Sequence, residues 1–338
     1  MFNFSFFIAI ITIFCIYFYN KNNWVLRHLK TNDEFSNESS KIHSKKKIFT
    51  GTGIIFLIVF YFGIFFYSFE KINAPYNFFY FIAMLSIITI ISFIDDINRL
   101  DPIFRLSIQL ICVYSSLTSL NLVSINIPLK ISFLFSVIVW VYIINITNFI
   151  DGSDGICCIN VLNFFIGILI LNYFYNFNFF SVTIAKIIVP ILLAFLLFNY
   201  PPAKNYMGDA GSIFLGFLVG FSVLEFIIGG IYFILILYIY PLLDCSITLS
   251  KKILKGYWPW KRLGDYYFLI PKKQSSYNNS ELTIVSKKVF YYFVTHFIFN
   301  IFFLILSIYL DIKLLLIFNI ISSFILINIF RSRRIKVY

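Results

Sequence analysis

Long apolar segments alternate with short polar ones along the whole chain, and this alternation predicts a helical membrane protein. A helix needs about 20 apolar residues to cross the hydrocarbon core of a bilayer. Eleven segments approach that length: residues 2–20, 50–69, 77–94, 104–122, 131–147, 158–175, 183–199, 211–228, 230–249, 289–309 and 312–330. We therefore expect an all-α polytopic membrane protein, a bundle of about 10–11 transmembrane helices, with residues 1–338 forming a single domain.

The Lys and Arg residues are distributed unevenly between the polar segments. If the first span starts outside, 23 of the 27 lie in or beside the inside segments, and the others are Lys71, Lys130, Lys186 and Lys313. Membrane proteins keep such an excess on the cytoplasmic side. The bias predicts an outside N-terminus, a cytoplasmic C-terminus, and cytoplasmic loops at about 21–49, 95–103, 148–157, 200–210 and 250–288.

The composition excludes several other classes of protein. With 60% hydrophobic residues and only 12% charged, the chain is not an ordinary soluble domain. Its net charge of +12 comes from residues placed between apolar runs, so we expect no nucleic-acid partner. The five cysteines lack the spacing of a zinc site or a disulfide framework. The first apolar run lacks a basic start and a small-residue cleavage site, so we interpret it as a retained span.

Three acidic segments fall on the same predicted side of the membrane. The first contains the adjacent pair Asp95 and Asp96 at the end of a span. Neighbouring carboxylates repel one another unless a cation neutralises them, which indicates a cation site or a proton acceptor. The alternative is a solvated helix end with a capping role. Because acidic groups are costly at the end of a membrane helix, three such segments suggest a site for a divalent cation and phosphorylated substrates.

The second segment reads NITNFIDGSDG, from Asn145 to Gly155. Steps of three place Asn145, Asn148 and Asp151 along one side of a helix that leaves the membrane. Their amide and carboxylate groups are suited to sugar hydroxyls or a base edge, so all three are predicted to contact substrate. Gly152 and Gly155 permit turns and close approach to a ligand. The glutamate that ends an EF-hand loop is missing, which argues against a calcium loop.

The third segment is PPAKNYMGDAGS, in which the two prolines end the preceding helix. Lys204 supplies a charge suited to phosphate. Asp209 precedes the next predicted span and lies close to a helix N-terminus. Hard cations such as Mg²⁺ take carboxylate ligands and complete their shell with water and phosphate oxygens.

In this order, the three motifs resemble those of the polyprenyl-phosphate N-acetylhexosamine-1-phosphate transferases: DDxxxLDP followed by Arg105, NxxNxxDGxDG, and PAKxxMGDxGS. The resemblance spans roughly residues 37–270, with a degraded echo of the family's first motif at 37–43 and 50–53. It implies transfer of a hexosamine-1-phosphate from a UDP-N-acetylhexosamine to polyprenyl (undecaprenyl) phosphate, releasing UMP and requiring Mg²⁺, for which Mn²⁺ substitutes. It also implies a bacterial cytoplasmic (inner) membrane, a cytoplasmic active site, a surface-glycan pathway such as O-antigen or capsule, and a homodimer.

Roles for individual residues follow from the same resemblance. Asp209 would be the principal Mg²⁺ ligand, with Asp151 as a second. Asp95 and Asp96 would act on the polyprenyl phosphate or its proton. Contacts to the UDP-sugar are implied for Asn148, Asp151, Asp154, Lys204, Tyr206 and Arg105, with Asp154 on the uracil and Tyr206 stacked on the base.

The chain departs from the family in its last predicted cytoplasmic loop. The usual histidine-bearing stretch is replaced by residues 260–269, which contain no histidine. There Arg262 would preserve a basic substrate contact, whereas Asp265 is an unexplained substitution. The departure argues against the peptidoglycan enzyme and leaves the sugar open. A transporter or flippase is the alternative, although such proteins place polar groups near the midplane; an inactive scaffold is another. Glu225 is expected deep in a span, making a structural hydrogen bond.

Overall fold

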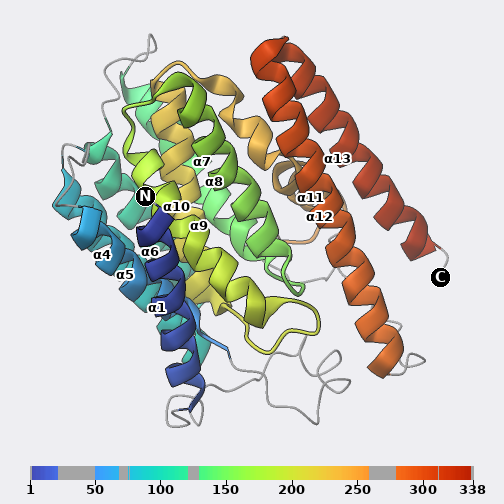
Figure 1. Cartoon of the computed structure of the whole chain (residues 1–338), viewed down its shortest axis with the longest axis horizontal. Helices are drawn as coiled ribbons and strands as arrows, with labels where there is room; N and C mark the ends of the chain where they lie inside the picture. The colour runs from blue at the N-terminus through green and yellow to red at the C-terminus, as the bar shows by residue number, and fades with distance from the viewer. Residues whose placement is uncertain are drawn as a thin grey trace.

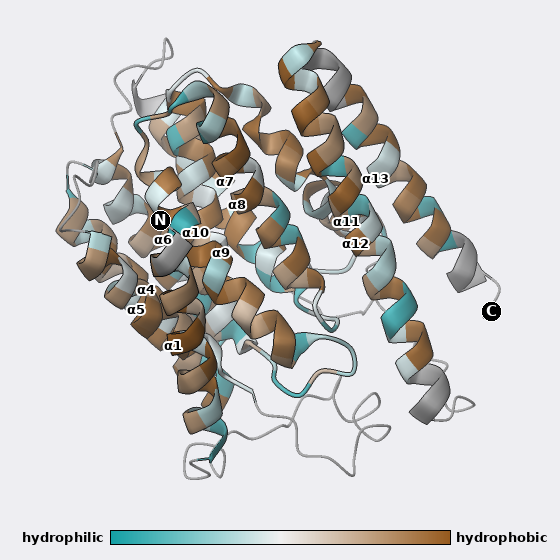
Figure 2. Ribbon diagram, in the orientation of Figure 1, coloured by the Kyte–Doolittle hydropathy of each residue, from teal (hydrophilic) through white to brown (hydrophobic). Residues whose placement is uncertain are grey.

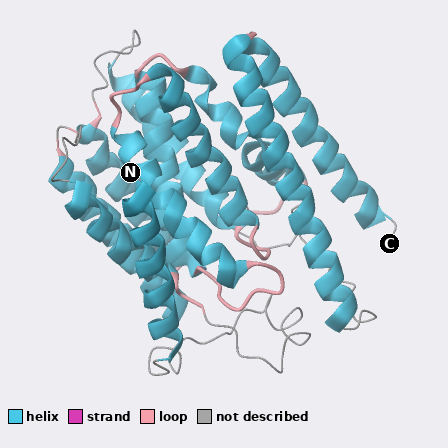
Figure 3. Cartoon of the chain, in the orientation of Figure 1, coloured by secondary structure: helices cyan, strands magenta, loops and turns pink. Residues whose placement is uncertain are grey.

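The computed structural model describes residues 2–21, 50–67, 75, 77–120, 129–258, 279–310 and 312–335. Within those residues every regular element is a helix (Figures 1 and 3). The elements are α1 (Phe2–Lys21), α4 (Gly53–Tyr67), α5 (Phe78–Ile97), α6 (Pro102–Ser116), the 3₁₀ helix η1 (Leu117–Ser119), α7 (Leu129–Ile150), α8 (Ile156–Tyr175), α9 (Phe180–Asn199), α10 (Gly208–Ile228), the 3₁₀ helix η3 (Tyr232–Tyr238), α11 (Ile239–Leu254), α12 (Asn279–Tyr309) and α13 (Ile312–Ile335).

The predicted class, an all-α polytopic membrane protein, is confirmed. Eight helices in the described residues are long and apolar enough to cross a membrane, and two shorter apolar helices, Gly53–Tyr67 and Ile317–Arg331, accompany them. Figure 2 shows hydrophobic residues along most of their length. The segment predicted at 104–122 is the shorter pair α6 and η1. Which side of the membrane holds each terminus stays a prediction.

Several predicted boundaries were wrong at the ends of the spans, where the site lies. Helix α7 continues to Ile150 and α8 starts at Ile156, so their connection is shorter than the predicted loop 148–157. Helix α10 starts at Gly208 instead of residue 211, which places Asp209 inside its first turn. Polar side chains lower the hydropathy at a helix end. A span predicted from hydropathy therefore stops before the helical hydrogen bonding does.

Helix α10 forms the centre of the bundle. In its span, 83% of the residues are buried, compared with 17% in the span of α1. It packs against α7, α5 and α4. The indole Nε1 of Trp140 on α7 donates to the Phe217 carbonyl at 2.9 Å, and Gly220 leaves room for that ring. Side chains on the first turn of α10 are therefore attached to the most enclosed helix of the described bundle.

The polar ends of successive helices meet at one end of the bundle. Asn20 at the end of α1 exchanges side-chain amide hydrogen bonds with Asn205, at 2.8 and 3.2 Å. The Oδ1 of Asn199, at the end of α9, accepts from the Gly155 N–H just before α8 at 2.9 Å. Thr52, just before α4, donates from its hydroxyl to the Tyr206 carbonyl at 2.8 Å. The connections that carry the second and third motifs are therefore joined at this end to α1 and to the start of α4.

Glu225 lies in the last turn of α10, towards the opposite end of the bundle, and not in mid-span as predicted. Its carboxylate accepts the backbone N–H groups of Phe180 at 3.0 Å and Ser181 at 2.8 Å, and also the Ser181 hydroxyl. These donors begin α9, where N–H groups have no partner within the helix. The expected structural hydrogen bond is confirmed: Glu225 caps a neighbouring helix.

Candidate active site

The first turn of α10 is held by a carboxylate from another helix. Asp96, in the last turn of α5, accepts the N–H of Asp209 at 2.8 Å and of Ala210 at 3.1 Å. Free N–H groups at a helix N-terminus favour an anion in this position. Gly208 is required for the approach, because its φ is +71° and an added Cβ would lie 2.4 Å from an Asp96 oxygen. Asp96 thus fixes the direction in which the Asp209 side chain extends from α10.

Asp95 and Asp209 share one guanidinium group. Arg105 Nη1 lies 2.6 Å from Asp95 Oδ2 and 2.9 Å from Asp209 Oδ2. The other oxygen of Asp95 accepts the Leu100 N–H at 2.6 Å. One cationic group from α6 therefore neutralises carboxylates of α5 and α10.

The LDP part of the first motif explains how Arg105 reaches this position. Asp101 is the N-cap of α6 and accepts the N–H groups of Ile103 at 2.8 Å and Phe104 at 3.2 Å. Pro102 follows at the first helical position, where its missing N–H costs nothing. This capping role was not predicted, although an aspartate before a proline at a helix start signals it.

Asn148 completes the surroundings of Asp209. Its Nδ2 donates to Asp209 Oδ1 and to the Ser212 hydroxyl, both at 3.0 Å. Both Asp209 oxygens therefore have protein donors, Asn148 on one and Arg105 on the other. Ser212 was not predicted as a site residue.

Asn145 was predicted to share this surface, and the structure gives it other partners. Its Nδ2 donates to the Gln109 side chain at 2.7 Å and to the Val141 carbonyl at 2.8 Å. Asn145 lies one turn deeper than Asn148 and joins α7 to α6. The contact of Asn145 with substrate stays a prediction. The bond to Gln109 was not predicted because Gln109 lies inside an apolar segment.

Asp151 and Asp154 lie in the turn between α7 and α8, so Asp151 is not on the helix as expected. Burial, followed by the charges of Asp209, Asp96 and Asp154, raises the pKa of Asp151 well above its usual value. Asp154 accepts the Ala203 N–H at 3.0 Å. Arg105, from the first segment, donates to Asp95 and Asp209, and Asn148 of the second segment also donates to Asp209, so the three acidic segments form one centre. A bound cation would relieve the mutual repulsion of their carboxylates.

Tyr206 and Lys204 come from the connection between α9 and α10. The Tyr206 side chain is hydrogen-bonded to Asp154, and burial, with Asp154 and Asp151 nearby, raises the pKa of its phenol. Lys204 is exposed at the same end of the bundle. A base stacked on Tyr206 and a phosphate bound by Lys204 remain predictions. Arg262 and Asp265 lie outside the described residues.

The echo of the family's first motif lies directly against this centre. The Gly53 N–H donates to the Met207 carbonyl at 2.9 Å, and an added Cβ on Gly53 would lie 2.0 Å from the Gly211 nitrogen. The starts of α4 and α10 therefore touch through backbone atoms. Residues 37–43 of the echo lie outside the described residues.

The donor atoms of the centre suit a hard cation. Asp209 and Asp95 present carboxylate oxygens around a position that the Arg105 cation already reaches. In the described parts of the chain, no three His, Cys, Asp or Glu side chains are grouped as a metal site. Mg²⁺ is usually held by one or two carboxylates, with water and substrate phosphates as further ligands. The residues present therefore fit Mg²⁺ in that mode.

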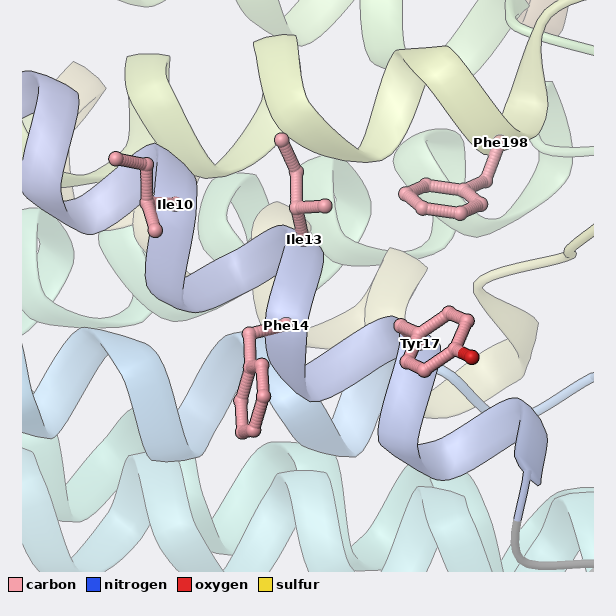
Figure 4. A pocket seen from close by; sticks show the side chains of 5 residues that line it. All are labelled: Ile10, Ile13, Phe14, Tyr17 and Phe198. Carbon is pink, nitrogen blue, oxygen red and sulfur yellow. The ribbon is translucent and has the colours of Figure 1, made fainter.

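A separate apolar groove lies on the outer face of the bundle (Figure 4). It has a volume of about 330 Å³ and is lined by Ile10, Ile13, Phe14 and Tyr17 of α1 and Phe198 of α9. These α1 side chains are exposed, as expected where a helix faces lipid. The groove is lined by none of the motif carboxylates, so the chemistry is assigned to the acidic centre.

Comparison with known proteins finds relatives for the segment that carries the acidic centre. Residues 78–227, just under half of the chain, match the family model described as Glycosyl transferase family 4. A phospho-N-acetylmuramoyl-pentapeptide-transferase of Streptococcus uberis is 30% identical over 187 residues, covering 48% of this chain and 55% of the relative. One of Streptococcus pyogenes serotype M49 is 35% identical over 103 residues, 30% of each chain. The chain thus spans about half the length, or less, of these relatives, and the family match contains Asp95, Asp96, Asp151, Asp154 and Asp209.

Proposed function

Because residues 78–227 match the model of glycosyl transferase family 4, we propose that this chain transfers a hexosamine-1-phosphate from a UDP-N-acetylhexosamine to a polyprenyl phosphate. In the reaction an oxygen of the lipid phosphate attacks the β-phosphorus of the UDP-sugar. The bond between that phosphorus and the bridging oxygen breaks, and UMP leaves. The products are a polyprenyl-diphospho-sugar and UMP.

The convergence of the aspartates at one end of a membrane bundle carries this proposal. A polyprenyl phosphate keeps its chain in the bilayer and its phosphate at the surface, whereas a nucleotide-sugar arrives from water. Only the end of a bundle is reached by both. Arg105 of α6 joins Asp95 of α5 to Asp209 of α10 there. Asp96 of α5 accepts the Asp209 N–H, and Asn148 of α7 also donates to Asp209.

The roles proposed for the individual residues are those that the family resemblance implies. Asp209, with Asp151 nearby, would hold Mg²⁺, which when bound neutralises the diphosphate and the departing UMP. Asp96 fixes the first turn of α10 through two backbone N–H groups. Asp95 would act on the lipid phosphate or its proton. Asn148 would lie along the diphosphate, with Asp154 and Tyr206 beside the uracil.

The same proposal covers the location of the protein. We place it in a bacterial cytoplasmic membrane with the N-terminus outside, the acidic centre facing the cytoplasm, and a homodimer as the assembly. The product would be the first lipid-linked intermediate of a cell-surface glycan.

A donor screen tests the function. The purified full chain is supplied with undecaprenyl phosphate, Mg²⁺ and sugar-labelled UDP-GlcNAc, UDP-GalNAc or a 6-deoxy analogue. An activated N-acetylmuramoyl-pentapeptide is included because the relatives above are named for that phospho-sugar. Labelled lipid from one donor, absent with Asp209→Asn, is the expected result. A folded protein that labels no lipid with any donor would reject the proposal.

A further inference from the structure

The contacts around Asp209 leave no carboxylate oxygen without a protein donor. Oδ1 accepts from Asn148 at 3.0 Å, and Oδ2 accepts from Arg105 at 2.9 Å. Each oxygen can accept a second bond, but a divalent cation bound at Oδ2 would lie against the positively charged Arg105 guanidinium, and two cations so close repel each other. That repulsion acts on Arg105 and not on the neutral Asn148 amide.

Arg105 is the donor better able to move. Asn148 is held twice, because its Nδ2 also donates to the Ser212 hydroxyl at 3.0 Å, and its short side chain extends from α7. Arg105 comes from the first turn of α6 on a long unbranched stem, and 25% of its side-chain surface is exposed. Its guanidinium can therefore withdraw from the carboxylates without moving a helix.

We propose that Arg105 is an exchangeable counter-ion: it occupies the cation position between Asp95 and Asp209, is displaced when the metal enters, and then binds a substrate phosphate. The exchange rests on the proposed function, since it requires a metal and phosphorylated substrates at this centre. One arginine thereby neutralises the carboxylates before the metal binds and the phosphates afterwards. Arginine suits both positions because its planar guanidinium pairs with carboxylate and phosphate oxygens alike.

The exchange predicts that removing Arg105 strengthens metal binding in the absence of substrate. Mn²⁺ is titrated into the purified full chain in detergent, without donor or lipid, and free Mn²⁺ is measured by electron paramagnetic resonance. The Mn²⁺ Kd of Arg105→Gln should fall on the order of tenfold, the size of one lost charge-assisted hydrogen bond. Arg105→Lys, which keeps the charge on a different head group, should lie between it and the wild type.

Arg99→Gln is the matched control, because it removes the same charge from the connection between α5 and α6 but Arg99 takes part in neither ion pair. Its Mn²⁺ Kd should stay within about twofold of the wild-type value, the scale of an exposed charge. A second titration uses inorganic pyrophosphate at saturating Mn²⁺. There Arg105→Gln should bind about tenfold more weakly than the wild type, because the phosphate ligand is gone.

The outcomes separate the exchange from the proposed function. Unchanged or weaker Mn²⁺ binding by Arg105→Gln overturns the exchange, as does unchanged pyrophosphate binding. If Arg105→Gln shows both changes but the wild type transfers no phospho-sugar, the proposed transferase activity is rejected and the exchange stands. A wild type that binds no Mn²⁺ overturns both.

Discussion

Replacing Gly208 with alanine should displace the Asp96 carboxylate and thereby misplace Asp209. Gly208 starts α10 with a φ of +71°, and Asp96 passes directly over its Cα. An added Cβ would lie 2.4 Å from Asp96 Oδ2 and 2.9 Å from its Cγ. Contacts shorter than 3.0 Å do not persist for real Cβ atoms, so the carboxylate must retreat by about 0.6 Å or more. That movement lengthens its bonds to the first turn of α10.

Gly230 provides a control with the same backbone strain and no contact. Its φ is +81°, and an added Cβ meets nothing within 4 Å. A left-handed conformation costs a non-glycine residue about 1–2 kcal/mol, so both variants should lose a similar stability from strain. A displacement approaching 1 Å at a reacting centre costs on the order of 100-fold in rate. The difference between the two variants therefore measures the displacement of Asp96.

The assay compares initial rates of labelled-lipid formation and thermal unfolding of both purified variants. Gly208→Ala should lose on the order of 100-fold in kcat relative to Gly230→Ala, with an unfolding midpoint within a few degrees of it. Equal activity of the two variants would refute the reasoning that Asp96 positions Asp209.

Metal binding at Asp209 and the Glu225 cap at the opposite end of the bundle can each be tested by removal. Asp209→Asn should abolish turnover in a folded protein, because a neutral amide is a poor ligand for Mg²⁺; wild-type activity would remove Asp209 as the ligand. EDTA should abolish lipid labelling and added Mg²⁺ or Mn²⁺ should restore it, whereas an EDTA-insensitive preparation counts against a metal mechanism. Glu225→Gln should lower stability by about 1–3 kcal/mol by placing an amide donor against the N–H groups that begin α9; an unchanged unfolding midpoint would contradict the cap.

The helices and the motif-bearing connections followed from the sequence because both are local patterns. Apolar length defines a span, and proline or glycine marks where it ends, as at residues 200–208. Steps of three correctly placed Asn145 and Asn148 on the same helix. The same spacing did not show that the helix ends at Ile150, which leaves Asp151 in the following turn.

The contacts that organise the centre could not be predicted from the sequence pattern, because they join segments that are distant in the chain. Arg105 and Asp209 form an ion pair although they are 104 residues apart in the chain. Gln109 and Asn145 form a hydrogen bond only because α6 packs on α7. Glu225 caps α9 for the same reason. Such bonds depend on which helices are neighbours, and periodicity within one helix carries no information about that.

The position of the phosphorus label in the products distinguishes transfer of a phospho-sugar from transfer of the sugar alone. The accepted donor is prepared with ³²P at either the α- or the β-phosphate and incubated with the full chain, undecaprenyl phosphate and Mg²⁺. A phospho-sugar transfer predicts that the β-label enters the lipid and the α-label remains in UMP. Lipid that acquires the sugar without the β-label, or that acquires the α-label, would contradict the account.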